Sequence, residues 1–231
     1  MTEILALWER ACIAGPLARD DALLGDAAPT SLSARNAALL ALRVRLLGAT
    51  QNLRAGCPVC GTALEFAIDC ETLAHSLLPA ADAGTFHEFE SDGYRVTYRA
   101  PDISDWRTAA ASNGFVPALM ERCIARCERD NGTQCEPASL PNAITDALSS
   151  ALEALEPGAI VDFDLHCPEC AAEWIAPMDC GAVLYAEISA RTESLLVEVD
   201  ALARAYGWSE AEVLALSPIR RAAYLQLVGT D

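Results

Sequence analysis

Two short segments of this chain repeat the same cysteine pattern, and they lie far apart in the sequence. The first, C-P-V-C, runs from Cys57 to Cys60, and the second, C-P-E-C, runs from Cys167 to Cys170. A C-P-x-C turn places two thiolates on one side of a tight loop, and two such turns that face each other complete a tetrahedral metal site. The repeat therefore predicts that these two distant segments fold against each other.

Thiolates at this spacing favour zinc. We expect one Zn²⁺ ion held by Cys57, Cys60, Cys167 and Cys170, supplied by the two halves of a split zinc ribbon. A site with four cysteine ligands has no open position for water, so the expected role of the zinc is structural and not catalytic. The long separation of the two pairs leaves two other arrangements open, namely two independent sites or one site shared between molecules.

The remaining cysteines lack such a pattern. Each C-P-x-C turn is followed at the same offset by Asp-Cys, and we interpret Cys70 and Cys180 as small core residues beneath the ribbon. Cys123 and Cys127 stand four residues apart and are expected on the buried face of a helix. A thioredoxin-type dithiol remains an alternative for the C-P-x-C segments, although that motif opens a helix in a βαβ unit and needs no second copy.

The excess of acidic over basic residues disfavours some classes of partner. The 231 residues include 33 acidic and 16 basic ones, which gives a net charge of -17. Such a field repels nucleic acids and anionic lipid, so we expect neither as a partner. The sequence contains no Gly-rich phosphate loop, no G-x-S-x-G and no H-E-x-x-H motif, and we therefore expect no enzymatic activity.

The start of the chain bears on its location. Met1-Thr2-Glu3 lacks a basic segment, and the apolar run from Ala37 to Leu42 is cut short by Arg43. We expect neither a signal peptide nor a membrane span, and hence a protein of the cytoplasm of a bacterial or phage-infected cell. In that compartment cysteines act as metal ligands or core residues and not as disulfides.

The hydrophobic patterns predict an α+β fold in which helical N- and C-terminal regions surround a small antiparallel sheet with the split zinc ribbon. Predicted helices include Glu3–Ala14, Ala34–Leu47, Gly181–Tyr206 and three pieces within Ile103–Leu155. Predicted strands are Ala63–Ile68, a hairpin within Phe86–Tyr98 and Ile160–Leu165. The expected regions are 1–56 (helical), 57–180 (ribbon and sheet, with a helical insertion at about 101–159) and 181–231 (helical).

Several runs in the first half resemble a known family. They are Ser33–Arg43 (SARNAALLALR), which leads through Gly48 to Cys57–Cys60, and the strand Leu64–Asp69 (LEFAID). On these residues the chain resembles the baseplate hub assembly chaperone family of T-even type contractile phages.

The second half looks closer to relatives encoded beside phage-tail-like contractile injection systems. The matching runs are Leu165–Cys170 (LHCPEC), Glu187, Glu198–Glu210 (EVDALARAYGWSE) and Leu214–Leu225 (LALSPIRRAAYL). The resemblance covers most of the chain and is weak between Pro101 and Ala159. The chain departs from the pattern at Ala171, where a glycine is common, and at Pro177-Met178, where an aromatic residue is expected.

The resemblance implies a non-enzymatic assembly or structural protein whose partners are baseplate or hub proteins of a contractile tail-like particle. It leaves open whether the protein is incorporated into that particle. In that case Leu184–Val228 is the expected docking surface, with Tyr206, Trp208 and Tyr224 as anchors, unless these aromatic side chains fill a core. The alternative function is a zinc-ribbon adaptor that binds nucleic acid or protein in regulation, because Ala201–Leu225 can be threaded as a helix-turn-helix. The acidic charge of that segment disfavours DNA.

Overall fold

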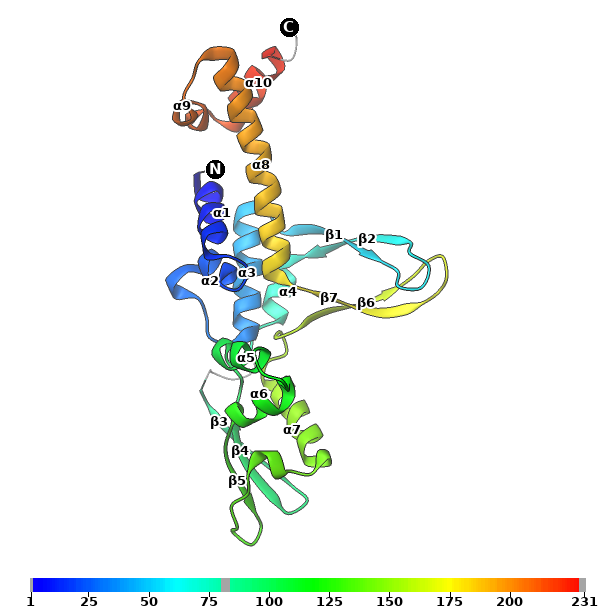
Figure 1. The fold of residues 1–231 in the computed structure, drawn as a ribbon. Coiled ribbons are helices and arrows are strands. Elements are labelled where there is room, and N and C mark those ends of the chain that lie inside the picture. Colours follow the sequence, from blue (N-terminus) through cyan, green and yellow to red (C-terminus); the bar gives the residue numbers. More distant parts are fainter. Residues whose placement is uncertain (1, 80–83, 229–231) are drawn as a thin grey trace. The chain divides into compact units, whose positions relative to one another are not determined.

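The computed structural model describes residues 2–79 and 84–228 (Figure 1). The chain divides into two compact units, one formed by Met1–Asp26 with Gly181–Asp231 and the other by Ala27–Cys180. Residues 27–56 of the predicted N-terminal region thus belong to the unit that carries the cysteine turns. The mixture of helices with small antiparallel sheets agrees with the predicted α+β class.

The smaller unit is helical. Its helices are α1 (Thr2–Ala14), α2 (Arg19–Leu24), α8 (Cys180–Tyr206, which starts at the last residue of the other unit), α9 (Glu210–Ala215) and α10 (Pro218–Val228). Gly15 and Gly207 follow α1 and α8 with φ of 72° and 70°, which a glycine adopts without strain. Ser209 and Glu212 form a capping box at the start of α9.

Side chains of α8 hold the first two helices. The hydroxyl of Tyr185 lies 3.2 Å from Cys12 Sγ of α1, and the Arg19 guanidinium of α2 stacks 3.9 Å from the centre of the Tyr185 ring. Four apolar side chains that lie along one side of α8 are buried, namely Leu184, Ile188, Leu195 and Leu202. Tyr206, the last residue of α8, is 39% exposed.

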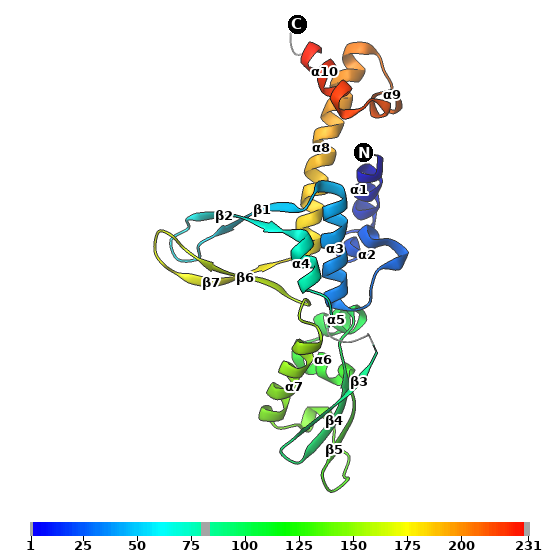
Figure 2. The same cartoon turned by 180° about the vertical axis from the view of Figure 1, so that it is seen from behind.

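Within residues 27–79 and 84–180, the larger unit combines five α-helices with three antiparallel sheets. Figure 2 shows these elements from behind. The helices are α3 (Leu32–Leu47), α4 (Cys70–Ser76), α5 (Ile103–Ala110), α6 (Phe115–Cys123) and α7 (Asn142–Leu155). Short 3-10 turns lie at Gly25–Ala27 (η1) and Pro137–Ser139 (η2), and η1 crosses the boundary between the two units. Ser31 caps α3 by accepting a hydrogen bond from the Ala34 amide, as its position before the helix predicts.

Two of the sheets are hairpins. They are formed by β1 (Thr50–Gly56) with β2 (Ala63–Asp69) and by β6 (Val161–His166) with β7 (Glu173–Met178). The sequence predicted β2 and β6 but not their partners, because β1 is largely polar and ends in Gly56, and β7 contains Pro177. Strand β1 therefore separates α3 from the first cysteine turn.

The third sheet has the order β3 (Phe86–Ser91), β4 (Tyr94–Arg99) and β5 (Ile124–Arg129). Its first two strands form the predicted hairpin, and Asp92 and Gly93 at the turn both have a positive φ, as a type I′ turn requires. The strand β5 replaces what the sequence presented as helix. Cys127 therefore lies on a strand and not on the helical face predicted for it.

Helices α6 and α7 share a core with this sheet. The buried members are Val96, Tyr98, Met120, Cys123, Cys127, Leu148 and Leu152. Burial raises the pKa of Cys123 to about 12, and burial, assisted by a hydrogen bond with Cys135, does the same for Cys127. Both thiols stay protonated at neutral pH, and the prediction that they are core residues is confirmed.

A polar connection ties the start of α3 to the loop that precedes β6. The buried carboxylate of Glu156 accepts hydrogen bonds from the Ser31 hydroxyl (2.9 Å) and the Ser33 amide (2.8 Å). The Asn36 side chain donates to the Gly158 carbonyl (2.7 Å), and the Gly158 amide donates to the Ser33 hydroxyl (2.9 Å). These bonds fix where β6 begins relative to α3.

Candidate metal centre

The two cysteine turns have the same backbone geometry. In the first, the Cys57 amide donates to the Thr62 carbonyl and the Gly61 amide donates to the Cys57 carbonyl, both at 2.9 Å. In the second, Cys167 pairs with Ala172 (2.9 Å) and Ala171 with Cys167 (3.0 Å) in the same way. Each turn therefore closes on its own first cysteine, which fixes the positions of both sulfurs on one side of the loop.

The hairpins that carry these turns also share one register. In the first, Gln51 pairs with Ile68 and Gly56 with Ala63. The equivalent pairs of the second are Val161 with Met178 and His166 with Glu173. Each hairpin is followed by a helix that begins at a cysteine, α4 at Cys70 and α8 at Cys180. The repeat seen in the sequence is thus a structural repeat of the type strand, turn, strand and helix start.

The structure brings the four predicted ligands together. Their sulfur atoms all lie within 4.8 Å of one another, with 3.7 Å between Cys57 and Cys170 and 3.5 Å between Cys60 and Cys167. A tetrahedral zinc ion with Zn–S bonds of about 2.3 Å sets its sulfurs about 3.8 Å apart. These distances exclude disulfide bonds and match the size of a four-thiolate metal site.

The two hairpins that carry the cysteine turns also meet through an aromatic contact. Along all four strands the residues of one face are less exposed than those of the other, as expected for a two-stranded ribbon covered on one side. The rings of Phe66 on β2 and Phe163 on β6 meet edge to face with their centres 5.5 Å apart. This contact joins the two hairpins without any metal.

The electrostatics of the cluster favour a bound cation. Hydrogen bonding to the Thr62 side chain and backbone lowers the pKa of Cys60 to about 6, and hydrogen bonding to the Cys60 backbone lowers the pKa of Cys57. Hydrogen bonding to the Ala172 backbone acts in the same direction on Cys170, but the neighbouring thiols and burial raise its pKa to about 12. Ionised thiols repel one another at this distance, and a divalent cation relieves that repulsion.

The cysteines that were not predicted as ligands lie elsewhere. Cys70 and Cys180 are buried and outside the cluster, and the Cys70 thiol donates to Gln51 Oε1 at 3.3 Å. His166, which directly precedes the ligand Cys167, is exposed. Within residues 2–79 and 84–228, no second group of three or more His, Cys, Asp or Glu side chains comes as close together.

Part of the predicted docking surface in α8–α10 forms contacts within the chain itself. Arg221, which lies in that segment, is only 2% exposed, and its Nε donates to Glu198 at 2.5 Å. The sequence gives no sign of this contact between α10 and α8. Tyr206, Trp208 and Tyr224 form a mutual cluster, with ring centres 4.7 to 5.6 Å apart.

Among the described helices, none combines the length and the apolar character that crossing a membrane requires. Comparison with models of known protein families, with curated proteins and with solved structures finds no match to this chain.

Proposed function

We propose that Cys57, Cys60, Cys167 and Cys170 bind one structural Zn²⁺ ion and that the two hairpins are the halves of a split zinc ribbon. The observation that carries this proposal is the convergence of two turns of equal geometry, whose four sulfurs lie within 4.8 Å. All four ligands are thiolates, so the coordination sphere is full and the metal performs no hydrolysis. Zinc in this position acts as a crosslink between hairpins from distant parts of the sequence.

The energetic role of the metal follows from the exposure of the site. Cys60 and Cys170 are exposed, and each hairpin alone has too few strands to be stable in water. Structural zinc contributes on the order of 10 kcal/mol in small modules at neutral pH. We expect the hairpins to depend on the metal more than the sheet β3–β4–β5, which has its own apolar core.

Elemental analysis of protein purified without chelator tests the proposal. We expect one zinc per chain, reduced in Cys57→Ser and in Cys167→Ser. The matched controls are Cys70→Ser and Cys180→Ser, which remove a thiol from the equivalent buried position after each hairpin and retain the zinc. Absence of zinc from the unmodified protein, or its loss in the two controls, contradicts this ligand set.

Two further measurements separate the alternative arrangements. Native mass spectrometry distinguishes one zinc in a monomer from two zinc ions per chain and from an ion shared between chains. Titration of accessible thiols with and without chelator distinguishes zinc from a redox dithiol. We expect Cys60 and Cys170, the exposed ligands, to react only after the chelator removes the metal.

We further propose that the zinc-stabilised protein is an assembly factor or minor structural part of a phage-like contractile tail or injection-system baseplate. Its support is the resemblance of the runs described above, which fall on α3, on the two hairpins with their cysteine turns and on α8–α10. A non-enzymatic role agrees with a closed metal site. Its partners are then baseplate or hub proteins.

Co-expression tests this wider role. Affinity-tagged chain is produced with each baseplate and hub protein encoded near its gene, and we expect one of them to co-purify in a defined ratio. The metal-site variant Cys167→Ser reports whether the interaction needs the intact ribbon. The absence of sheath, tube and baseplate genes from the neighbourhood, or of any stable complex with their products, contradicts this part of the proposal and leaves the zinc site unaffected.

A further inference from the structure

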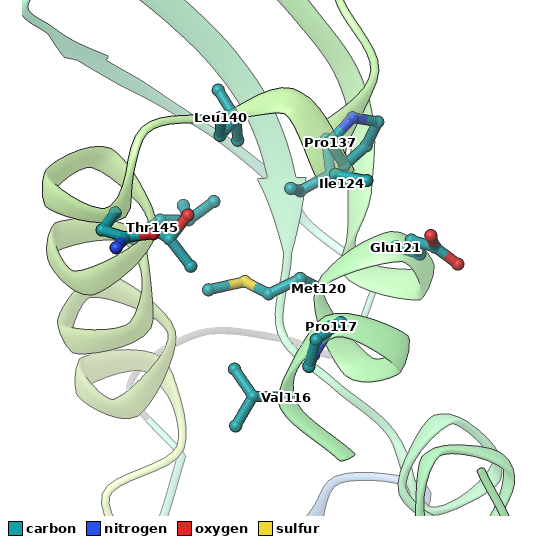
Figure 3. A pocket seen from close by; sticks show the side chains of 11 residues that line it. Val116, Pro117, Met120, Glu121, Ile124, Pro137, Leu140 and Thr145 are labelled. Carbon is teal, nitrogen blue, oxygen red and sulfur yellow. The ribbon is translucent and has the colours of Figure 1, made fainter. Parts of the chain in front are cut away.

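An apolar groove lies between α6 and α7 in the larger unit, apart from the metal centre. It consists of two adjoining cavities of about 390 and 450 Å³, which share Val116 and Met120 of α6. Figure 3 shows the first cavity, in which Met120 points from α6 toward α7, with Leu140 and Pro137 closing one end and Val116 near the other. Trp106, Phe115, Leu119 and Leu152 line the second cavity.

The groove is open to solvent at its centre. Val116 is 50% exposed and Ile160, at the edge of the second cavity, is 59% exposed. Trp106 and Phe115 pack edge to face with their ring centres 4.7 Å apart, which gives that cavity a firm aromatic wall. Large apolar side chains that stay exposed along a groove are typical of protein interaction sites.

The rim of the groove is acidic. Its lining includes Glu121 in the first cavity and Glu153, Glu156 and Asp162 in the second, and no arginine. The carboxylate of Glu156 accepts hydrogen bonds from Ser31 and Ser33. The carboxylates of Glu121, Glu153 and Asp162 form no ion pair within the described parts of the chain. Apolar surface between carboxylates at both ends is complementary to a ligand with an apolar face flanked by cations.

We propose that this groove binds an amphipathic helix of a partner protein that carries bulky apolar side chains on one face and Lys or Arg at its edges. A helix fits because the groove runs between helices, and α7, with 14 residues, offers a wall about 21 Å long. A second copy of this chain is a poor occupant, since its net charge of -17 repels the acidic rim. The binding does not depend on the metal centre.

Synthetic peptides provide the probe. The first is a fluorescent 18-residue helix with leucines on one face and lysines on both flanks, the second is a scramble of the same composition, and the third carries glutamate in place of lysine. With the zinc-loaded chain we expect fluorescence anisotropy to show at least tenfold tighter binding of the first peptide than of the other two. Equal binding of the scramble, which measures attraction to net charge alone, overturns the proposal.

Two substitutions test whether the peptide binds in the groove. Val116→Asn removes apolar surface at the junction of the two cavities, and Ile175→Asn makes the same kind of change at a residue that is 63% exposed on β7. We expect a loss of at least tenfold in affinity for the first variant and less than twofold for the second. Equal losses of peptide affinity in the two variants contradict the proposal. So does a dimer of the unmodified chain that Val116→Asn abolishes, because the groove would then hold a second copy and not a partner helix.

Chemical crosslinking gives an independent readout. The sequence contains no lysine, so carbodiimide coupling between its carboxylates and the peptide lysines reports only intermolecular contacts. We expect the crosslinks to map to Glu121, Glu153 or Asp162. Crosslinks distributed over exposed carboxylates of the hairpins, such as Glu65 and Glu173, overturn the proposal.

Discussion

Gly61 and Ala171 occupy equivalent positions in the two cysteine turns, and both adopt a positive φ, 77° and 58°. Each donates its amide to the carbonyl of the first cysteine of its turn. Glycine adopts this left-handed conformation freely, whereas alanine adopts it at a cost of about 1 kcal/mol. The departure of Ala171 from the glycine expected there therefore leaves the site geometry intact and places strain in the second turn.

This relationship predicts opposite effects for two exchanges. Ala171→Gly should raise the free energy of unfolding by about 0.5–1 kcal/mol, and Gly61→Ala should lower it by about 1 kcal/mol. A Cβ atom at Gly61 meets no atom within 4 Å, so the second effect comes from the backbone alone. Urea unfolding at a fixed free zinc concentration measures both. A change of the same sign in the two variants contradicts the equivalence of the turns.

The buried ion pairs of Asp105 predict that the folded protein loses stability at low pH. It is 1% exposed and accepts hydrogen bonds from Arg99 (2.6 Å) and Arg122 (2.8 Å). Its burial acts to raise the pKa, but the bonds from Arg99 and the Asp102 backbone, joined by Arg122, outweigh it and lower the pKa. Because removal of one partner leaves buried charges uncompensated, Asp105→Asn should cost about 3 kcal/mol at pH 7.

The sign of the pH effect follows from the lowered pKa. The ionised Asp105 contributes its stability above the unfolded-state pKa of about 4 and loses it as the pH falls below that value. The difference in unfolding free energy between the wild type and Asp105→Asn should therefore shrink below about pH 4. Glu90→Gln is the control, since the Glu90–Arg95 pair is more than half exposed and should contribute less than about 1 kcal/mol. A constant difference across this range contradicts the assignment.

Arg221 is buried, whereas its neighbour Arg220 is exposed. Alanine variants of the two residues therefore form a matched pair. Arg221→Ala leaves Glu198 without its buried partner and should destabilise the packing of α10 by about 2–4 kcal/mol. Arg220 is exposed, and Arg220→Ala should change stability by less than about 0.5 kcal/mol. Hydrogen exchange of the α9 and α10 amides measures the effect locally. Equal exchange rates in the two variants argue against a structural role for the Arg221–Glu198 pair.

The charge of the chain predicts an absence of DNA binding. At a net charge of -17 we expect no binding of random duplex DNA at about 0.15 M salt, because binding depends on cations that release the counterions of the phosphates. Fluorescence anisotropy with labelled duplex checks this, with a basic DNA-binding domain as positive control. Salt-dependent micromolar binding supports the regulatory adaptor in place of the baseplate role.

The sequence by itself determined the features that depend on near neighbours along the chain. Glycine fixes the ends of α1 and α8, Ser209 starts α9, and Asp92-Gly93 turns the β3–β4 hairpin, because positive φ angles and helix caps are set within a few residues. The spacing within each cysteine pair is equally local. The grouping of all four cysteines as one ligand set was predicted from the repeat, and the structure brings their sulfurs together.

Only the tertiary structure decided which segments pair across long distances. Strands β1, β5 and β7 escaped prediction because β1 is largely polar, β7 contains Pro177 and β5 lies in a segment with a helical pattern. They form strands through hydrogen bonds with β2, β4 and β6. The partners of Asp105, Glu156 and Arg221 and the groove between α6 and α7 were likewise invisible in the sequence. Burial and ion pairing arise between residues that folding brings together, and no periodicity within a single segment encodes which distant segment will supply the contact.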